Sequence, residues 1–285
     1  MGVKIIVDSA SDVRYDVACR EGIGFAPLKT ILAGEEYRDG IDMTPDVFYD
    51  KLRAAAELAS TSQVSAAEFS ELFREATDAG DEVLVITLSS GLSGTYQSAM
   101  VAAADYPGRV FVVDSLSATA GEQVLLSHAL KLRAQGMGAG ELFEALIALR
   151  ARLRLVLRVE TLEYLKRGGR VSKTAAFVGG LLHFMPILRL NEEGKLETLG
   201  KARGAKMSHK MLNDCIANFG GIDPSMPVHM TYAGDVNDGT VQAYLKDSTE
   251  TFAECRDQLS IGQLGCVIGT HTGPGAIIVA FIAKE

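Results

Sequence analysis

Residues 84–99, LVITLSSGLSGTYQSA, pass from an apolar run to a loop of small polar residues and then to a helical pattern. A short β-branched run that ends in a polar loop predicts a buried strand, and small polar residues before the next segment predict a helix start. The loop holds five hydroxyl side chains and two glycines: Thr87, Ser89, Ser90, Ser93, Thr95, Gly91 and Gly94. Such a loop suits a nucleophilic serine, a phosphate or a carboxylate.

The same order of strand, loop and helix recurs through the first half of the chain. Strands are predicted at 4–8 (KIIVD), 82–88 (EVLVITL) and 109–114 (RVFVVD), and helices from about 44, 66, 96, 120 and 139. Ser65 and Glu68 predict a capping box at the start of the helix near 66. Strands that are apolar throughout and alternate with helices predict a parallel sheet covered on both faces. A hairpin with Gly34 in its turn is predicted within 26–40.

The second half has a different rhythm and predicts a mixed α+β unit. Residues 152–159 alternate with period two, 185–203 contain two strands joined at NEEG, and 274–285 end in a further strand. Helices are predicted within 160–170, 204–221 and 238–246. We therefore expect an N-terminal α/β domain over 1–160 and a C-terminal domain over 161–285, with a ligand between them. The hairpin within 26–40 is free to pack with the second domain.

Composition excludes several classes of function. A net charge of −8 argues against nucleic-acid binding, and four scattered cysteines argue against a zinc site or a disulfide framework. The N-terminal apolar run is too short for a signal peptide, and no apolar stretch reaches the roughly 20 residues that span a bilayer. We expect a cytoplasmic protein without a metal or cofactor, whose membrane contact is at most transient.

The loop at 90–95 raises the hypothesis of a nucleophilic serine. GLSGT matches the G-x-S-x-G elbow of hydrolases up to Thr95, which replaces the last glycine. A hydrolase also needs a histidine, and His271 is the one that is expected in a loop of small residues, IGTHTGPGA. A serine hydrolase or acyltransferase that uses Ser93 with His271 remains open on this evidence.

Phosphate has weaker support than a carboxylate. The chain lacks G-x-x-x-x-G-K-[ST], and two glycines do not make a dinucleotide fingerprint. Two hydroxyl-rich segments, 60–63 (STSQ) and 90–95, precede predicted helices, where hydroxyls and backbone N–H groups could bind a carboxylate. Plain helix caps explain either segment alone. Asp8 and Asp114, at predicted strand ends, are expected to cap their loops and bring them to one region.

Seven motifs in this order resemble the DegV family, specifically the fatty-acid-binding subunit of bacterial fatty acid kinases. They are VDSASDV at 7–13, TSQ at 61–63, LSSGLSGTYQSA at 88–99, VVDS at 112–115, LEYLKRGGRVS at 162–172, KARG at 201–204 and GTHTGPGA at 269–276. The resemblance covers the chain from about residue 3. It departs from the family pattern at Val64, where a proline is usual.

The resemblance implies a two-domain carrier that buries a fatty acid and is not catalytic alone. Thr61 and Ser93 would hold the carboxylate, with backbone groups near Ser62 and Gly94, and His271 close by. A partner kinase would phosphorylate the carboxylate with ATP, and the acyl phosphate would enter phospholipid synthesis. A lipid sensor without a kinase is a further alternative.

An apolar segment and a basic segment are relevant to the carrier hypothesis. Residues 173–190 supply apolar side chains for an acyl tunnel or, equally, for an ordinary core: Phe177, Leu181, Leu182, Phe184, Met185 and Ile187. Residues 150–173 hold eight basic side chains and two acids, which suggests a basic rim. By resemblance, Arg170 and Arg203 lie near the mouth and serve the kinase contact or the phosphorylated head group. Arg170 follows the helix stop at Gly168 and Gly169, so its side chain is expected to project from a loop, and Arg203 is expected at the end of a hairpin strand.

Overall fold

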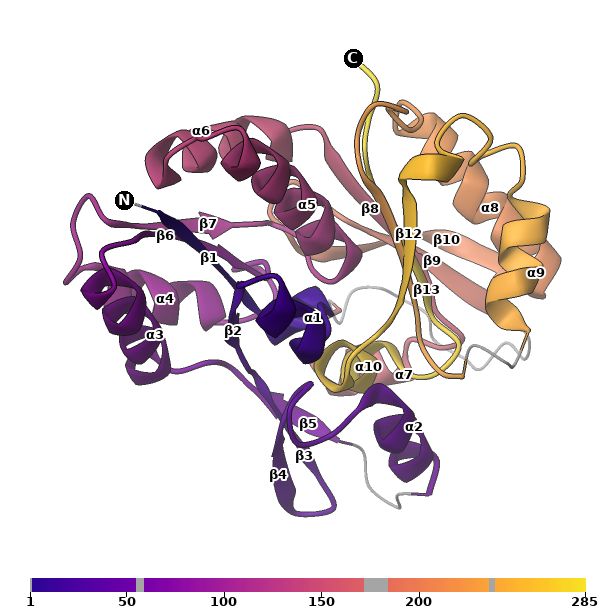
Figure 1. The fold of residues 1–285 in the computed structure, drawn as a ribbon. Helices are drawn as coiled ribbons and strands as arrows, with labels where there is room; N and C mark the ends of the chain where they lie inside the picture. Colours follow the sequence, from indigo (N-terminus) through magenta and orange to yellow (C-terminus); the bar gives the residue numbers. More distant parts are fainter. Residues whose placement is uncertain (1, 55–58, 172–183, 236–238) are drawn as a thin grey trace.

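The computed structural model describes residues 2–54, 59–171, 184–235 and 239–285. These residues form three sheets with helices around them (Figure 1). Two of the sheets make the centres of an N-terminal and a C-terminal part, and the third is a small antiparallel sheet beside them.

The N-terminal sheet is parallel, as predicted, with strand order β2-β1-β6-β7. Its strands are β1 (Val3–Asp8), β2 (Gly24–Ala26), β6 (Glu82–Thr87) and β7 (Val110–Asp114). Helices α3 (Ala66–Asp78) and α4 (Thr95–Ala103) cover one face, and α5 (Ala120–Ala134) and α6 (Ala139–Arg150) the other (Figure 1). The short α1 (Tyr15–Arg20) and the 3₁₀ turn η1 (Ser9–Ser11) complete this part. Fully buried strands such as β6 require cover on both faces.

The C-terminal sheet is mixed, again as predicted, with order β10-β9-β8-β13-β11-β12. Its strands are β8 (Leu153–Arg158), β9 (Phe184–Leu190), β10 (Leu196–Arg203), β11 (Val228–Tyr232), β12 (Leu259–Gln263) and β13 (Ile277–Ile282). Helices α8 (Ala205–Asn218) and α9 (Thr240–Asp247) lie on its outer side (Figure 1), and the 3₁₀ turn η3 (Arg256–Gln258) precedes β12. The sheet begins with β8, so it includes residues on the N-terminal side of the expected boundary at 160.

The predicted hairpin is confirmed as β3 (Lys29–Leu32) and β4 (Glu35–Arg38). Ala33 and Gly34 both have positive φ, 53° and 80°, as a two-residue turn that follows the strand twist requires. A third strand, β5 (Ser60–Ser62), pairs with β3. Residues 60–62 therefore form an edge strand and are not helix caps, whereas Ser65 caps α3 as predicted.

The small sheet lies against a C-terminal helix, α10 (Cys266–Thr272), together with α2 (Pro45–Ala54). Asp39, which follows β4, accepts hydrogen bonds from the backbone N–H groups of Cys266 at 2.9 Å and Val267 at 3.4 Å. The hairpin therefore contacts residues that are more than 200 positions away in the chain.

The strand-end aspartates cap their loops as predicted. Asp8 accepts from the N–H groups of Ala10 at 2.9 Å and Leu88 at 2.8 Å, and Asp114 accepts from Leu116 at 3.0 Å and Ser90 at 3.1 Å. Each carboxylate thereby joins its own loop to the loop after β6. The convergence of the three loops at the carboxyl ends of parallel strands is confirmed.

In the part of the chain that the structure describes, every helix is too short or too polar to cross a bilayer.

Helix α3 allows a direct test of the local sequence signal. Ser65 accepts from the N–H of Glu68, whose carboxylate accepts in return from the N–H of Ser65 at 2.8 Å. We expect Ser65→Ala to lower the free energy of unfolding by about 1 kcal/mol, because the helix loses its cap. Ser70→Ala is the matched control, since its hydroxyl only bonds back to the carbonyl of Ala66. Equal denaturant midpoints for Ser65→Ala and wild type would contradict the assignment of the cap.

Candidate functional site

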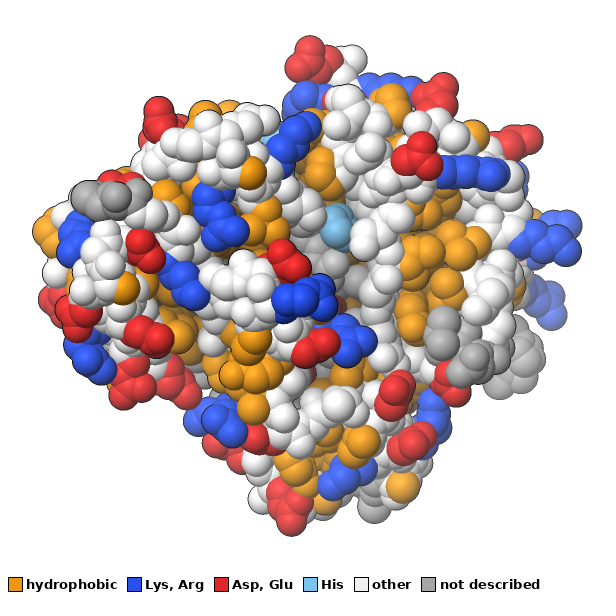
Figure 2. Space-filling view, viewed as in Figure 1, with side chains coloured by type: hydrophobic (Ala, Val, Ile, Leu, Met, Phe, Trp, Pro, Cys, Tyr) orange, Lys and Arg blue, Asp and Glu red, His pale blue; other side chains and the backbone are white. Residues whose placement is uncertain are grey.

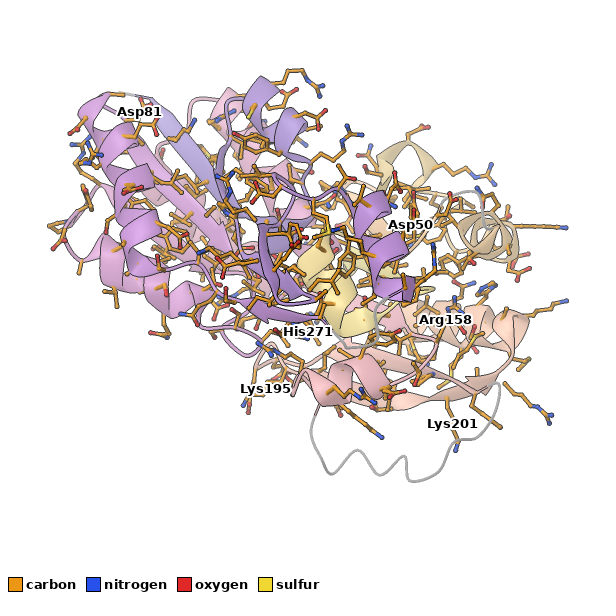
Figure 3. The ribbon with its side chains drawn as sticks, turned by 90° about the horizontal axis from the view of Figure 1, so that it is seen from below. Asp50, Asp81, Arg158, Lys195, Lys201 and His271 are labelled. Carbon is orange, nitrogen blue, oxygen red and sulfur yellow. The ribbon has the colours of Figure 1, made fainter. Side chains whose placement is uncertain are left out.

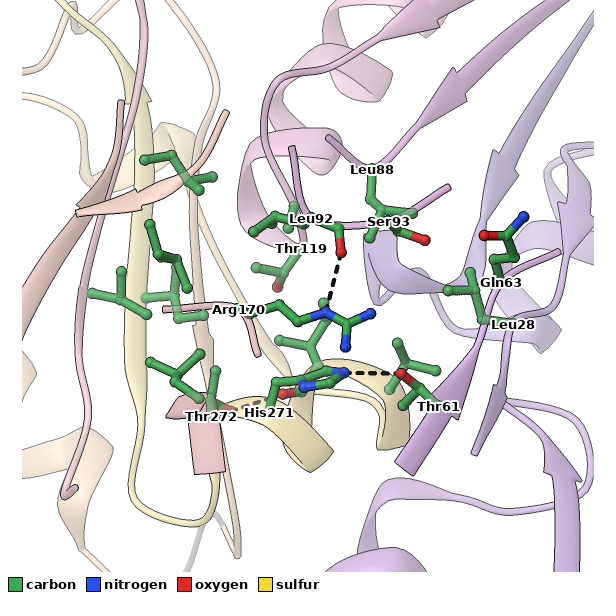
Figure 4. A pocket seen from close by; sticks show the side chains of 18 of the residues that line it. Leu28, Thr61, Gln63, Leu88, Leu92, Ser93, Thr119, Arg170, His271 and Thr272 are labelled. Atoms are coloured by element: carbon green, nitrogen blue, oxygen red, sulfur yellow. Dashed lines mark hydrogen bonds between the residues drawn. The ribbon is translucent and has the colours of Figure 1, made fainter. Parts of the chain in front are cut away.

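A cavity of about 310 Å³ lies where the two large parts meet the small sheet (Figure 4). Most of its wall is aliphatic, and polar side chains gather in one region. The aliphatic lining is Leu28, Leu88, Leu92, Ala118, Leu155, Leu157, Leu165, Leu190, Leu196, Val267, Ile268 and Ile278. The other lining residues are Thr61, Ser62, Gln63, Ser93, Gly94, Thr119, Arg170, His271 and Thr272.

The structure brings the predicted site residues together from four separate segments. Thr61 and Ser62 lie on β5, Ser93 and Gly94 precede α4, and His271 lies on α10. Arg170 follows α7 (Glu163–Arg167) and lines the same cavity. Arg203, by contrast, is exposed at the end of β10 and is not among the lining residues.

His271 and Thr61 form the central pair of the polar region. Nε2 of His271 lies 2.9 Å from Oγ1 of Thr61 (Figure 4). Burial and, to a smaller extent, the positive charge of Arg170 together lower the pKa of His271 to about 4. The imidazole is therefore neutral at pH 7, and it shares one hydrogen bond with the hydroxyl of Thr61.

His271 lies in a helix, which corrects the expectation that it occupies a loop. The seven-residue α10 is held at its start by two carboxylates from the N-terminal part. Asp12 accepts from the N–H of Gly265 at 2.8 Å, and Asp39 accepts from the next two residues. Burial raises the pKa of Asp39, whereas the hydrogen bond from the Cys266 backbone favours its ionised form. At the other end of α10, a Cβ on Gly168 would lie 2.2 Å from Nδ1 of His271, so the chain approaches the ring closely there.

Arg170 lies in the loop after α7, but its side chain turns into the cavity and does not project outward. Its guanidinium is half-buried and lies between Leu92 and the pair of His271 and Thr61 (Figure 4). Nε donates to the carbonyl of Leu92 at 3.2 Å and Nη1 to that of Gly168 at 2.5 Å. Among the described residues, no carboxylate lies within ion-pair distance of it. Burial alone lowers its pKa, and a guanidinium remains charged nonetheless.

Ser93 does not form the pair that a hydrolase requires. Its hydroxyl lies 3.0 Å from that of Thr95 and accepts a hydrogen bond from the Thr95 N–H at 3.2 Å. These local contacts are those of a turn before α4. His271 bonds to Thr61 instead, and its Nδ1 has no hydrogen-bond partner among the residues described here. A general base needs contact with the nucleophile and an acid behind it, so this geometry does not favour the hydrolase hypothesis.

The described basic residues of the predicted rim, which end at Arg170, do not form one surface, and Lys173 lies outside the described residues. Arg158 is 1% exposed and bonds to Glu160 at 2.8 Å and to the carbonyl of Gly275, while Arg152 pairs with Asp223 at 2.7 Å. Figure 3 shows Arg158, Lys201 and His271 in separate places. On the face in Figure 2, basic and acidic side chains are interspersed. Local charge counting along the sequence misses this dispersal because neighbours in a strand point to opposite faces.

Two lining residues, Gln63 and Thr119, were not predicted as site residues from the sequence. Gln63 donates to the hydroxyl of Ser98 at 2.9 Å, and Thr119 precedes α5 with a φ of 49°, which is rare for a β-branched residue. Thr119 shares a hydrogen bond of 2.9 Å with Thr231 across the two parts. The available signal for Gln63 was its place in the TSQ motif at 61–63, whereas nothing in the sequence marks Thr119.

Most of the predicted apolar tunnel segment, including Phe177, Leu181 and Leu182, lies outside the described residues. Ile187 is buried on the α8 side of the sheet, in ordinary core. Leu190 is the described member of 173–190 that lines the cavity. Within the described ranges, no group of histidine, cysteine and acidic side chains is arranged to hold a metal.

A family model described as "Uncharacterised protein, DegV family" matches residues 2–284. The chain belongs to the DegV family. A DegV domain-containing protein of Caldanaerobacter subterraneus subsp. tengcongensis is 34% identical over 287 residues, which cover 99% of both chains. The motif-based resemblance is thus confirmed at the level of the family.

Solved DegV structures share this fold over the full length. A DegV family protein from Thermus thermophilus, described for its fatty acid binding, is 34% identical, with a TM-score of 0.88 over 99% of this chain and all of that one. The Streptococcus pneumoniae Fatty Acid Kinase (Fak) B3 protein loaded with linoleic acid has a TM-score of 0.85 at 24% identity, with full coverage of both chains. The second comparison bears on the fold alone.

The protonation of His271 can be tested directly. We expect the His271 ring to titrate near pH 4, identified by NMR of the histidine ring protons and by loss of the signal in His271→Gln. Because the unfolded chain takes up this proton near pH 6.5, the protonation should reduce stability as the pH falls from 6.5 to about 4. An anion bound beside Arg170 should raise the His271 pKa. A ring that titrates at 6.5 in the folded protein would contradict this account.

Proposed function

We propose that this protein binds a long-chain fatty acid, with the carboxylate beside Arg170, Thr61 and His271 and the acyl chain along the aliphatic wall. The observation that carries the proposal is the unpaired guanidinium of Arg170. A half-buried cation is costly unless an anion compensates it, and no carboxylate of the described chain does so. A ligand carboxylate would accept from the guanidinium in the bidentate geometry that arginine favours.

The rest of the cavity fits an acyl chain. Its aliphatic lining offers no hydrogen-bonding side chain to a polar ligand body, and each buried methylene contributes about 0.8 kcal/mol. The polar side chains gathered near Arg170 therefore set the orientation, while the wall supplies most of the affinity.

The Thermus thermophilus relative supports the same assignment. Its published description is of fatty acid binding, and it matches this chain over nearly its whole length at 34% identity. The Thermotoga maritima DegV protein, 28% identical with a TM-score of 0.83, is described as lipid binding.

We further propose that a separate ATP-dependent kinase phosphorylates the bound carboxylate, giving an acyl phosphate for phospholipid synthesis. The chain carries no P-loop motif, and Ser93 and His271 are not arranged for covalent catalysis. The carrier would then contribute orientation, and neutral His271 would share the carboxylate with Arg170 and the Thr61 hydroxyl. In this role Arg203, exposed at the end of β10, would meet the kinase.

Ligand binding is tested by a change at Arg170. We expect Arg170→Gln to weaken palmitate binding at least tenfold in a titration, because a hydrogen bond to a charged group contributes about 1.5–3 kcal/mol. Binding of hexadecanol, which lacks the carboxylate, should change little. Arg167→Gln is the matched control, since Arg167 is exposed and pairs with Glu163 on α7. Equal losses for the acid and the alcohol would show that Arg170 acts through the fold rather than through the head group.

The kinase step is tested separately at Arg203. We expect Arg203→Ala to leave palmitate binding unchanged and to lower carrier-dependent phosphorylation by the cognate kinase, with Arg203→Lys intermediate because lysine lacks the forked donor geometry. Lys210→Ala, on α8 and paired with Asp214, is the control. Normal phosphorylation by Arg203→Ala would remove Arg203 from the kinase contact. An absence of phosphorylation in the wild type would favour a lipid sensor.

A further inference from the structure

A second cavity, of about 720 Å³, lies on the other side of two leucines that line the first. Leu155 and Leu190 belong to both walls. The second cavity is bounded by the end of α6, the start of β8, the end of β9 and the end of α8. Figure 1 shows β8 between α6 and α8. The proposed fatty-acid site leaves this cavity unused.

Three arginines distinguish this cavity chemically from its neighbour. Arg150, Arg154 and Arg189 line it, and Glu192 is the one acidic side chain among its lining residues. All three arginines are half-buried, whereas Glu192 is exposed. The lining residues therefore carry a net positive charge of about two, in a chain whose total charge is −8.

Two of the three guanidiniums keep donors available. Arg150 donates to the carbonyl of Asp114, and Arg154 donates to the carbonyls of Ala151 at 2.8 Å and Leu153 at 2.9 Å. Within the described part of the chain, neither has a carboxylate within ion-pair distance. A guanidinium has five N–H donors, so backbone carbonyls use only part of this capacity.

The third arginine and the apolar wall shape the rest of the cavity. Arg189 is held by Glu197 at 2.8 Å and lies over the ring of Phe219, 5.3 Å from its centre. Phe219, Leu155 and Leu190 add apolar side chains to the wall of the same cavity. The combination suits a ligand with a compact anionic end and an apolar body.

We propose that this second cavity binds a phosphate monoester that carries an apolar group. Glu197 already compensates Arg189, so the charge left for a ligand is that of Arg150 and Arg154. A phosphate monoester bears a charge of about −1.5 to −2 near neutral pH, which matches these two guanidiniums, and its oxygens accept forked donors from both. The apolar group packs against Phe219 and the two shared leucines. The phosphate belongs to a soluble ester or to a lipid head group, and the two sources share this chemistry.

The test uses full-length protein already loaded with palmitate, so that the first cavity is filled. We expect phenyl phosphate to bind in a calorimetric titration, and Arg150→Gln or Arg154→Gln to weaken it about tenfold or more. Arg170→Gln and Arg167→Gln should leave phenyl phosphate affinity unchanged. Added salt should weaken binding in the wild type.

A second experiment tells a soluble phosphate ester from a lipid head group. The protein is sedimented with phosphatidylcholine vesicles that contain phosphatidic acid. Vesicle binding that is lost in Arg154→Gln would identify a lipid phosphate. Binding of phenyl phosphate without vesicle binding would identify a soluble ester, and either result supports the site. Absence of both, or loss of phenyl phosphate binding in Arg170→Gln alone, would overturn it. Arg154→Glu keeps the test informative if Arg150→Gln does not fold, because Arg154 bonds only to nearby backbone. Retained palmitate binding reports correct folding in the Arg150, Arg154 and Arg167 variants, and the circular dichroism spectrum and the thermal unfolding midpoint report it for Arg170→Gln, which is loaded with excess palmitate.

Discussion

Two carboxylates on the start of α10 hold the architecture of the site together. Asp12 and Asp39 come from different loops of the N-terminal part, yet both accept backbone N–H groups at the start of a helix from the far end of the chain. Unpaired amides at a buried helix start would be costly, and the partly positive helix end stabilises a carboxylate. These hydrogen bonds therefore fix α10 between the small sheet and the larger parts, and with it the position of His271.

The head-group region follows from that placement. His271 reaches Thr61 on β5, and the close passage of Gly168 leaves room for the ring and brings Arg170 over it. Because the ring is enclosed next to a cation, it stays neutral, and the positive charge of the region rests on Arg170. One half-buried cation among neutral hydrogen-bonding groups, in a largely aliphatic cavity, is the arrangement that the proposed fatty-acid site requires. The second cavity differs from the first in its charge, because three arginines line it beside apolar side chains.

Much of the hydroxyl-rich loop after β6 serves the fold rather than a ligand. Thr87 donates to the carbonyl of Val113, and Ser89 donates to the carbonyl of Gly194 in the turn between β9 and β10. Ser93 faces the cavity while it also shapes the start of α4. A loop that joins three strands and two parts of the protein needs many short donors, because its buried backbone groups must all find partners.

Local sequence signals were enough to predict part of this structure. Alternating buried strands and helices, the Ser65 cap, the hairpin turn at Gly34 and the capping aspartates each depend on residues a few positions apart, and the structure contains all of them. Family motifs also identified Thr61, Ser93 and His271, which the fold brings to one cavity. The tertiary structure alone decided that residues 60–62 pair as a strand, that His271 lies in a helix and that Arg170 turns inward. These features depend on partners from distant segments, such as β3 for β5 and Asp39 for α10, and such contacts leave no periodic or short-range pattern in the chain.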